Sequence, residues 1–374
     1  MKNLSLFKNY LLYRNHFQKV GNQANGFTLV ELLVTIIIGS LIVSSVTALL
    51  VDVTRANQQE KVRIATQQDM ERALDFIESD LKSAAYVYTG DELRDDRKDG
   101  DIGSVISQLD ITNSDDRPVV LAFWKPERIP YTPKGPNIPL QCDDGSGGLN
   151  SSLDNGSMTP QEKEEKLKEC EDLQVERRTY TLVVYLQDTN PTDTWSGKSV
   201  IQRYELRKYD DDETYTSNGK DYLKLSVNDD YADPVKEAEG FRNWPYDEND
   251  VSLVSSNKPV INRHNSVSPV LVDFVDDPSN DTGKLPTCLK EEDSNDNGKL
   301  ESGEDTNGNG VRDIYSRTPA ESKSKSFFAC VRQSRLDGDV SQGNQDVILY
   351  LRGNPDGRSG YENDPDSSTP LPTL

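Results

Sequence analysis

The sequence predicts an α+β protein, in which one long N-terminal helix lies on an antiparallel β-sheet. Residues 27–51 form an apolar run, and residues 52–85 continue it as an amphipathic segment that contains neither Gly nor Pro. Most of the runs that follow are short and rich in β-branched and aromatic residues. A single long helix followed mainly by strands is typical of the α+β class.

The apolar run from Phe27 to Val51 is 25 residues long, and Glu31 is its only ionisable side chain. Because about 20 apolar residues cross the hydrocarbon core of a bilayer, the run predicts a single transmembrane helix. The preceding residues 1–26 carry basic side chains and no acidic one, which predicts a cytoplasmic N-terminus and an exported C-terminal domain. A carboxylate inside such a span is costly, so Glu31 is predicted to have a function.

The residues around Glu31 resemble the N-terminus of type IV pilins and pseudopilins, in which a basic leader ends in Gly and is followed by Phe and, five residues after the Gly, by Glu. The resemblance implies that prepilin peptidase cleaves between Gly26 and Phe27 and methylates the new terminus. It also implies that Glu31 pairs with the terminal amine of a neighbouring subunit, so that each buried charge offsets the desolvation of the other. A secretory signal fits less well, because its apolar region spans only about 7–15 residues and precedes its cleavage site. An ordinary membrane anchor with an incidental Glu is the other alternative.

The amphipathic segment 52–85 carries one apolar face at helical spacing, formed by Met70, Leu74, Ile77, Leu81 and Ala84. It resembles the corresponding helix of J-type minor pseudopilins and W-type minor pilins, which implies a pilin-like fold. The predicted organisation is a removed leader (1–26), a transmembrane helix (27–51), an amphipathic helix (52–85), a β-rich extracytoplasmic domain (86–352) and a disordered tail (353–374).

The β-rich domain is predicted to combine strands with polar insertions. The segments predicted as strands are 118–124, 179–187, 200–208, 222–227, 269–275, 326–332 and 346–352, of which 179–187 and 200–208 form a hairpin. The predicted insertions are 127–178, 228–265 and 276–325, and residues 209–219 are predicted as a loop. Within the first insertion, Thr159 and Glu162 read as a capping box at the start of a short helix.

The four cysteines are Cys142, Cys170, Cys288 and Cys330, and none forms a C-x-x-C pair, which argues against a zinc site. An even number of cysteines in an exported domain predicts disulfides. Of the three possible connectivities we favour Cys142–Cys170 with Cys288–Cys330, because each bond would then close one polar insertion. The spacing does not exclude the other two.

Residues 293–304 fit a calcium-binding loop, with oxygen ligands at alternate positions and a Gly at the sixth. A second copy starts at Asp305. The helices that flank an EF-hand are missing, so the pair is closer to extracellular Asp/Asn/Gly calcium repeats, and a surface loop that binds nothing is the alternative. The predicted calcium ligands are Asp293, Asn295, Asn297, Lys299, Glu301 and Glu304 in the first loop and Asp305, Asn307, Asn309 and Asp313 in the second.

Composition and motifs exclude other classes. The net charge of −22 argues against nucleic acid as a partner, because phosphate binding requires clustered Lys and Arg. The chain contains neither G-x-x-x-x-G-K-[ST] nor G-x-S-x-G, and His264 is its only histidine outside the leader. A single loop histidine is a poor candidate for a catalytic base, so the chain is predicted not to be an enzyme.

These features predict a minor pilin or pseudopilin of a type II secretion-like or type IV pilus-like filament, because the chain is much longer than a typical major pilin. Its predicted partners are other such subunits, prepilin peptidase and the inner membrane, with the C-terminal domain periplasmic or extracellular. One alternative is a pseudopilin of a polysaccharide secretion system, such as the hormogonium polysaccharide pseudopilins. Another is a membrane-tethered, calcium-dependent adhesin that never assembles.

Overall fold

The chain forms two compact units, Met1–Gln59 and Glu60–Leu374, and the helix α2 contributes to both. The computed structural model describes residues 26, 28–90, 92–93, 117–129, 142, 159–189, 194–217, 219–228, 231–234, 241, 244–245, 270–279, 288, 303–304, 312–319, 323–335 and 345–358.

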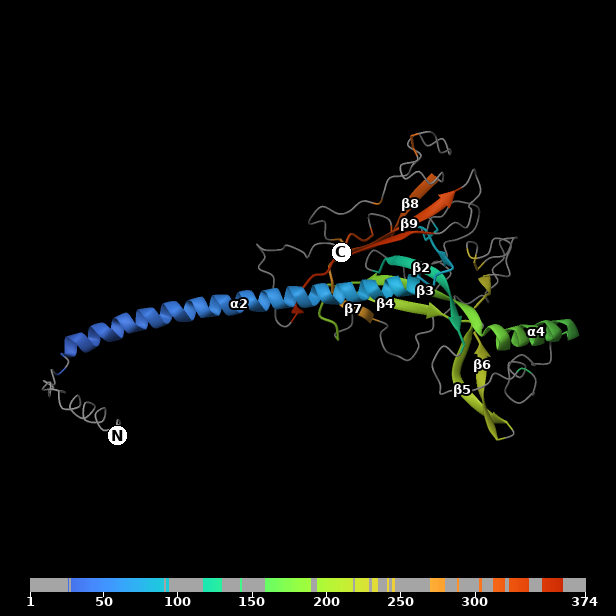
Figure 1. Cartoon of the computed structure of the whole chain (residues 1–374), viewed down its shortest axis with the longest axis horizontal. Helices are drawn as coiled ribbons and strands as arrows, with labels where there is room; N and C mark the ends of the chain where they lie inside the picture. The colour runs from blue at the N-terminus through green and yellow to red at the C-terminus, as the bar shows by residue number, and fades with distance from the viewer. Residues whose placement is uncertain are drawn as a thin grey trace, which may run out of the picture. The chain divides into compact units, whose positions relative to one another are not determined.

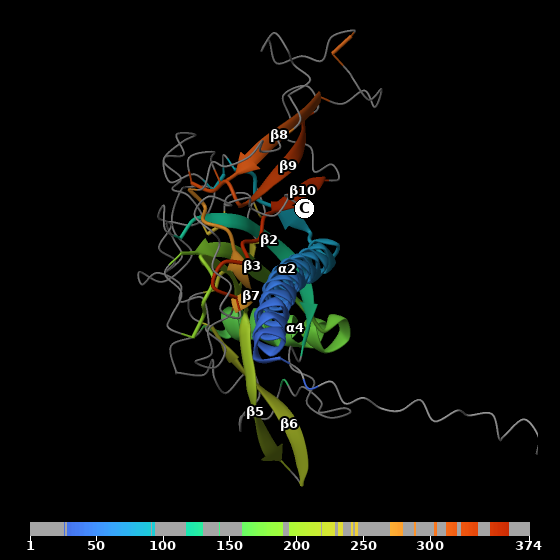
Figure 2. The same ribbon diagram turned by 90° about the vertical axis from the view of Figure 1, so that its left-hand side faces the viewer.

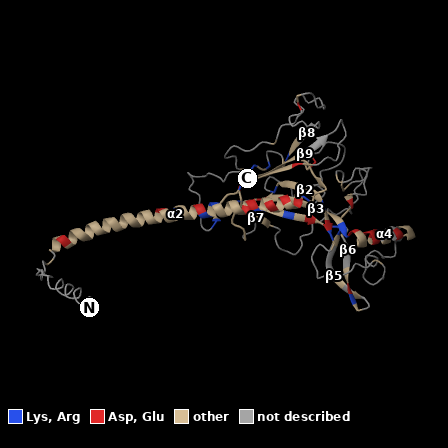
Figure 3. Cartoon of the chain, in the orientation of Figure 1, with Lys and Arg blue, Asp and Glu red and all other residues tan. Residues whose placement is uncertain are grey.

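Helix α2 runs without a break from Leu29 to Leu81 (Figure 1). Acidic and basic residues are sparse along its first half and frequent along its second half (Figure 3). The helix ends at Leu81 rather than at the predicted Ala85. The amides of Ser83 and Ala84 donate to carbonyls only three residues back, and the amide of Ala85 donates to the carbonyl of Trp124 at 2.7 Å. The chain therefore leaves the helix early because Ala85 joins the sheet.

The larger sheet has five antiparallel strands in the order β1-β2-β3-β4-β7. Strand β2 is a continuous apolar run from Val119 to Trp124, because side chains on both faces of the sheet are buried. The hairpin predicted from the sequence is confirmed by the pairing of β3 with β4. The strands of this sheet are β1 (Tyr86–Val87), β2 (Val119–Arg128), β3 (Arg178–Asp188), β4 (Ser199–Leu206) and β7 (Val270–Val275).

A second, three-stranded antiparallel sheet has the order β10-β9-β8, with β8 at Arg312–Thr318, β9 at Phe327–Arg335 and β10 at Val347–Leu351. Strands β5 (Tyr209–Ser217) and β6 (Lys220–Val227) form a separate hairpin, which extends away from the five-stranded sheet in both views (Figures 1 and 2). Helix α4 (Pro160–Glu176) lies in the first predicted insertion and extends the short helix predicted there.

The main core lies where the second half of α2 packs on both sheets, as Figure 2 shows for α2 beside β2, β3 and β7. The predicted apolar face of α2 is confirmed, since Met70 and Ile77 are fully buried and Leu74, Leu81 and Ala84 pack against them. The opposite face of the five-stranded sheet is covered by a second, aromatic-rich cluster that includes Trp124 and Trp244. The five-stranded sheet is thus buried on both sides.

Three elements were not predicted. Strand β1 is very short, β5 occupies the predicted loop 209–219, and β8 lies inside the predicted insertion 276–325. The acidic run at the start of β5 hides its strand character in the sequence, yet its backbone pairs with β6, with Glu213 in register with Lys224.

The predicted disordered tail is wrong for its first residues, since Gly353–Arg358 are ordered against α2. The guanidinium of Arg358 lies 2.7 Å from the carboxylate of Asp69, and Gly353 forms a bridge with Val275. A Cβ on Gly353 would lie 2.9 Å from the Cγ of Met70, so a glycine allows the chain to cross the helix closely. Residues 359–374 lie outside the described residues.

Candidate functional site

The predicted processing and assembly residues lie at the start of α2. Thr28 caps the helix, because its carbonyl accepts the first helical hydrogen bond from Leu32 at 3.1 Å. Its hydroxyl accepts a hydrogen bond from the amide of Glu31 at 3.3 Å. Thr28 and Glu31 thus have the spacing of a capping box, in which the carboxylate also stands near the positive end of the helix dipole. The T-x-x-E spacing was readable in the sequence, but a capping box at this position was not part of the sequence prediction.

The first half of α2 is long and apolar enough to cross a membrane, and none of its most apolar stretch is buried in the described structure. Three hydroxyl groups within it are satisfied by the helix itself. Those of Thr35, Ser40 and Thr47 each donate to a carbonyl three or four residues back, at 2.8–2.9 Å. In hydrocarbon an unsatisfied polar group costs several kcal/mol, so these bonds make the segment compatible with a bilayer.

The processing position itself makes few contacts. Among the described residues, no atom lies within 4 Å of a Cβ placed on Gly26, and Gly26 does not have the positive φ that would require glycine. The fold therefore gives no reason for glycine at this position. Phe27, on the other side of the predicted cleavage site, lies outside the described residues.

Where α2 ends, a network of charged side chains ties it to the five-stranded sheet. The carboxylate of Asp80 accepts hydrogen bonds from Arg203 Nε at 2.8 Å, the Tyr185 hydroxyl at 2.7 Å and Lys125 Nζ at 3.0 Å. Beyond the helix end, Glu205 pairs with Arg203 and with Arg207. The charged side chains of the network are only 11–20% exposed.

The network lowers the pKa of both buried carboxyls. Burial alone would raise the pKa of Asp80, but the charges of Arg203 and Lys125 and the hydrogen bond from Tyr185 outweigh it and hold the pKa below its usual value. Burial likewise opposes ionisation of Glu205, and Arg203 and Arg207 lower its pKa despite that. Burial and the neighbouring Asp80 raise the pKa of Tyr185, so its hydroxyl stays protonated and continues to donate.

The lowered pKa values predict a dependence of stability on pH. The stabilisation of the folded state by these two carboxylates is complete above about pH 5, where both carboxyls are ionised in the unfolded chain as well. It is lost as the pH falls below about 4 and approaches their lowered pKa values in the folded chain. We expect Asp80→Asn to destabilise the full chain in detergent near pH 7 and to approach the wild type near pH 2. Denaturant unfolding over this range measures the difference. The exposed Asp75 on the same helix is the control, and Asp75→Asn should show no comparable change with pH; a constant difference for Asp80→Asn would contradict the prediction.

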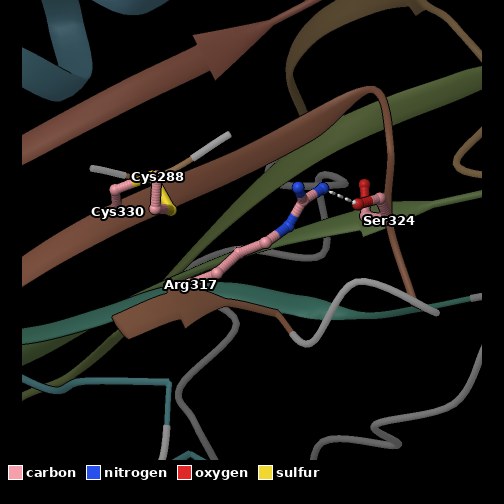
Figure 4. Close-up of a disulfide and its surroundings, with 4 residues drawn as sticks. All are labelled: Cys288, Arg317, Ser324 and Cys330. Carbon is pink, nitrogen blue, oxygen red and sulfur yellow. Dashed lines mark hydrogen bonds between the residues drawn. A yellow bond between two sulfur atoms is a disulfide. The ribbon is translucent and has the colours of Figure 1, made fainter. Parts of the chain in front are cut away.

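Both disulfides have the favoured connectivity. Cys142 bonds to Cys170 in α4, and Cys288 bonds to Cys330 in β9. Figure 4 shows the second bond close to Arg317, which lies opposite Cys330 in the β8–β9 register and donates a hydrogen bond to the carbonyl of Ser324 at 2.8 Å. The guanidinium of Arg317 also lies 3.7 Å from the centre of the Phe328 ring. The segment that follows Cys288 is therefore fastened to a well-packed strand.

The predicted calcium ligands lie largely outside the described residues. Asp293, Asn295, Asn297, Lys299, Glu301, Asp305, Asn307 and Asn309 are outside them, Glu304 is half-buried, and Asp313 is placed only by its backbone in β8. Within the described part of the chain, no three His, Cys, Asp or Glu side chains come together to form a metal site. Calcium binding therefore stays a prediction.

The charged network at the end of α2 was not predicted, although R-x-E-x-R at Arg203, Glu205 and Arg207 was a usable signal. Because side chains alternate along a strand, these three lie on one face of the sheet. Ile201 lies on the same face and packs into the main core. A strand that changes from apolar to charged on its buried side indicates that the covering helix ends there.

Comparison with known proteins found one similarity. The family model described as the prokaryotic N-terminal methylation motif matches residues 21–47, a range that contains Gly26, Phe27 and Glu31. Neither the curated proteins nor the solved structures contained a match. The methylation motif, the long apolar helix that follows it and the packing of that helix on antiparallel sheets together support a type IV pilin-like protein.

Proposed function

We propose that the chain is a minor pilin or pseudopilin that assembles into a type II secretion-like or type IV pilus-like filament. The observation that carries the proposal is the methylation motif placed directly on a helix whose first half is apolar and uncovered. Leu29, Leu41 and Leu49 each have more than 60% of their surface exposed in the isolated chain. Such a surface needs a cover, which lipid provides before assembly and neighbouring helices provide in a filament.

In this proposal the chain spans the inner membrane once. The leader stays in the cytoplasm, and the β-rich unit is periplasmic or extracellular, as the basic leader predicts. Prepilin peptidase removes residues 1–26 and methylates Phe27. The remaining helix then moves from lipid into the filament core, where Glu31 pairs with the terminal amine of a neighbour. The protein acts as a structural subunit, and its large insertions suit a subunit used sparingly.

The sharpest test separates the two roles of Glu31. Glu31→Leu removes both the carboxylate and the capping partner, whereas Glu31→Gln removes the charge and keeps a side chain that can serve in a capping box. We expect both variants to insert into the membrane at least as well as the wild type, because a costly carboxylate is gone. If charge pairing drives assembly, both should reduce incorporation into filaments by about tenfold or more, since 1.4 kcal/mol corresponds to a factor of ten.

The measurement is the fraction of the chain that co-purifies with sheared filaments relative to its amount in the membrane. Recovery of assembly in Glu31→Gln would assign the residue to the helix cap alone. Equal incorporation of Glu31→Leu and wild type would remove any role for Glu31. A wild-type chain that never co-purifies with filaments would favour the tethered adhesin over an assembling subunit.

We further propose that calcium binds residues 293–304, with residues 305–313 as a weaker second site. The support is the ligand spacing together with the anchoring of this segment at both ends, by the Cys288–Cys330 disulfide and by β8 from Arg312. Without the ion, the acidic side chains of the segment repel one another. An affinity on the order of 10⁻⁴–10⁻³ M is expected for extracellular loops of this kind.

Calcium should therefore stabilise the domain. At a tenfold excess over Kd, we expect about 1.4 kcal/mol of additional stability, because the ion binds only the folded state. The check is thermal unfolding of the full chain in detergent, in millimolar calcium and in chelator. Asp293→Ala should abolish most of the shift and Asp305→Ala less of it. An unchanged midpoint together with no calorimetric heat would show that the segment does not bind calcium.

A further inference from the structure

Two arginines face each other at the ends of β2 and β3. Arg128 is the last residue of β2, Arg178 is the first of β3, and the register places them directly opposite. Both side chains are exposed. Residues directly opposite in an antiparallel pair have Cβ atoms about 4.5–5.5 Å apart, and like charges at that position are destabilising. The arrangement therefore has a cost that the sheet itself does not explain.

Several other basic side chains on and beside this sheet have acidic partners. Lys125 pairs with Asp80, and Arg203 and Arg207 pair with Glu205. By contrast, no ion pair or hydrogen bond joins the guanidinium of Arg128 or Arg178 to a residue in the described part of the chain. The protein has a net charge of −22, yet the strand register places two arginines side by side at this position.

The two arginines line one cleft. Its volume is about 510 Å³, and the carboxylate-bearing Glu176 at the end of α4 lines it as well. Figure 3 marks basic residues in blue on the ribbon where β3 follows α4. Lys125 contacts Asp80, which places this part of β2 beside the end of α2. Arg128 lies three residues further along β2, and at about 3.3 Å per residue it is about 10 Å beyond the helix end. Within the unit Glu60–Leu374, the cleft is thus at the end opposite Glu60.

Capping of helix α4 does not account for the pair. A cation near a helix C-terminus is favourable, and Arg178 follows α4 closely. However, the amide of Arg177 already donates to the carbonyl of Leu173 at 2.8 Å, and the carbonyl of Arg177 accepts from the amide of Ile129 at 2.9 Å. Arg178 donates no hydrogen bond to a described carbonyl of the helix, and Arg128 belongs to a different element.

We propose that Arg128 and Arg178 together bind one carboxylate, an Asp or Glu side chain presented by a segment of a partner protein. A guanidinium is the side chain best matched to carboxylate geometry, and two of them flanking one slot can hold both oxygens. The inference rests on the proposed function only in that an assembled subunit meets other proteins at this end of the domain.

The surroundings favour a single carboxylate over a polyanion. Glu176 borders the same cleft, and the protein as a whole is strongly acidic. A ligand with closely spaced anionic groups would be repelled by Glu176 and by the acidic protein surface. A single carboxylate in an otherwise neutral segment would contact only the two arginines. An acidic polysaccharide is therefore the less favoured ligand and becomes an outcome of the test.

The test is the rate at which phenylglyoxal modifies each arginine of the full chain in detergent, read by peptide mass spectrometry. The probe is N-acetyl-Gly-Glu-Gly-amide, and the matched peptide carries Gln instead of Glu. A millimolar Kd is expected for a single clamped carboxylate, so the Glu peptide at several times that concentration should slow modification of Arg128 and Arg178 about fivefold. The exposed Arg55 on α2 should be unaffected, and so should all sites with the Gln peptide.

The variant Arg128→Gln keeps the experiment decisive. It removes a like-charge contact at an exposed position, so folding should be retained, and the Glu peptide should no longer protect Arg178. Protection of Arg178 that persists in this variant would overturn the paired site, as would equal protection by the Glu and Gln peptides. Stronger protection by alginate at the same carboxylate concentration would replace the protein partner with a polyanion. None of these readouts depends on filament assembly, so the proposed function and this site can fail separately.

Discussion

Asp276→Ala should destabilise the domain by about 3–5 kcal/mol, the usual cost of removing one partner from a buried ion pair. Its carboxylate lies 2.9 Å from Arg352 Nε, and the two side chains are only 1% and 3% exposed. Asn354 donates a further hydrogen bond to the same carboxylate at 2.8 Å. Asp276 follows β7 and Arg352 follows β10, so this pair joins the two larger sheets. Its loss would remove about a fifth or more of the stability of an ordinary domain, which is about 5–15 kcal/mol.

Two variants show whether the buried charge is the cause. Asp346→Ala removes an Arg–Asp pair with a largely exposed carboxylate, at Arg332 beside β10, and should cost less than about 1 kcal/mol. The double variant Asp276→Ala with Arg352→Met removes both charges and should recover much of the loss, because a buried pair replaced by apolar groups is often close to neutral. Denaturant unfolding of the full chain in detergent provides all three values. A loss below 1 kcal/mol for Asp276→Ala would mean that water or another residue compensates the remaining charge.

Gly26→Leu should abolish leader removal, whereas Gly26→Ala should be processed. A Cβ at this position meets no atom of the described residues within 4 Å, so neither variant should disturb the described fold. Any effect must then arise in the peptidase, which has to accommodate an extended backbone next to the membrane. A retained leader would also keep its basic residues attached to α2, and charged side chains cross a bilayer only at high cost.

Mass spectrometry of the membrane-extracted chain measures this result. The wild type and Gly26→Ala should begin at methylated Phe27, and Gly26→Leu should retain Met1. Equal amounts of each variant in the membrane are the control for insertion. Wild-type protein that begins at Met1, or complete processing of Gly26→Leu, would refute the assignment of the cleavage site.

The sequence alone determined the parts of this protein that depend on local pattern. The apolar run with Glu31 predicted the first half of α2, and the helical spacing of Met70 and Ile77 predicted the face that packs on the sheets. Both features are patterns of apolar residues over short stretches, and such patterns can be read directly from the sequence. The longer β-rich runs were found for the same reason. The disulfide pairing was favoured because each bond would close one polar insertion, and the structure selected it among the three connectivities.

Tertiary structure alone decided which charged residues meet. Asp80 and Arg203 are far apart in the sequence, as are Asp276 and Arg352, and nothing in either local stretch specifies the partner. The placement of Arg128 opposite Arg178 depends on the register of β2 with β3, and the length of the insertion between these strands does not determine that register. The order of Gly353–Arg358 likewise comes from contacts with α2. Long-range contacts are set by the packing of the whole domain, so the sequence predicted the elements and the structure decided how their polar groups combine.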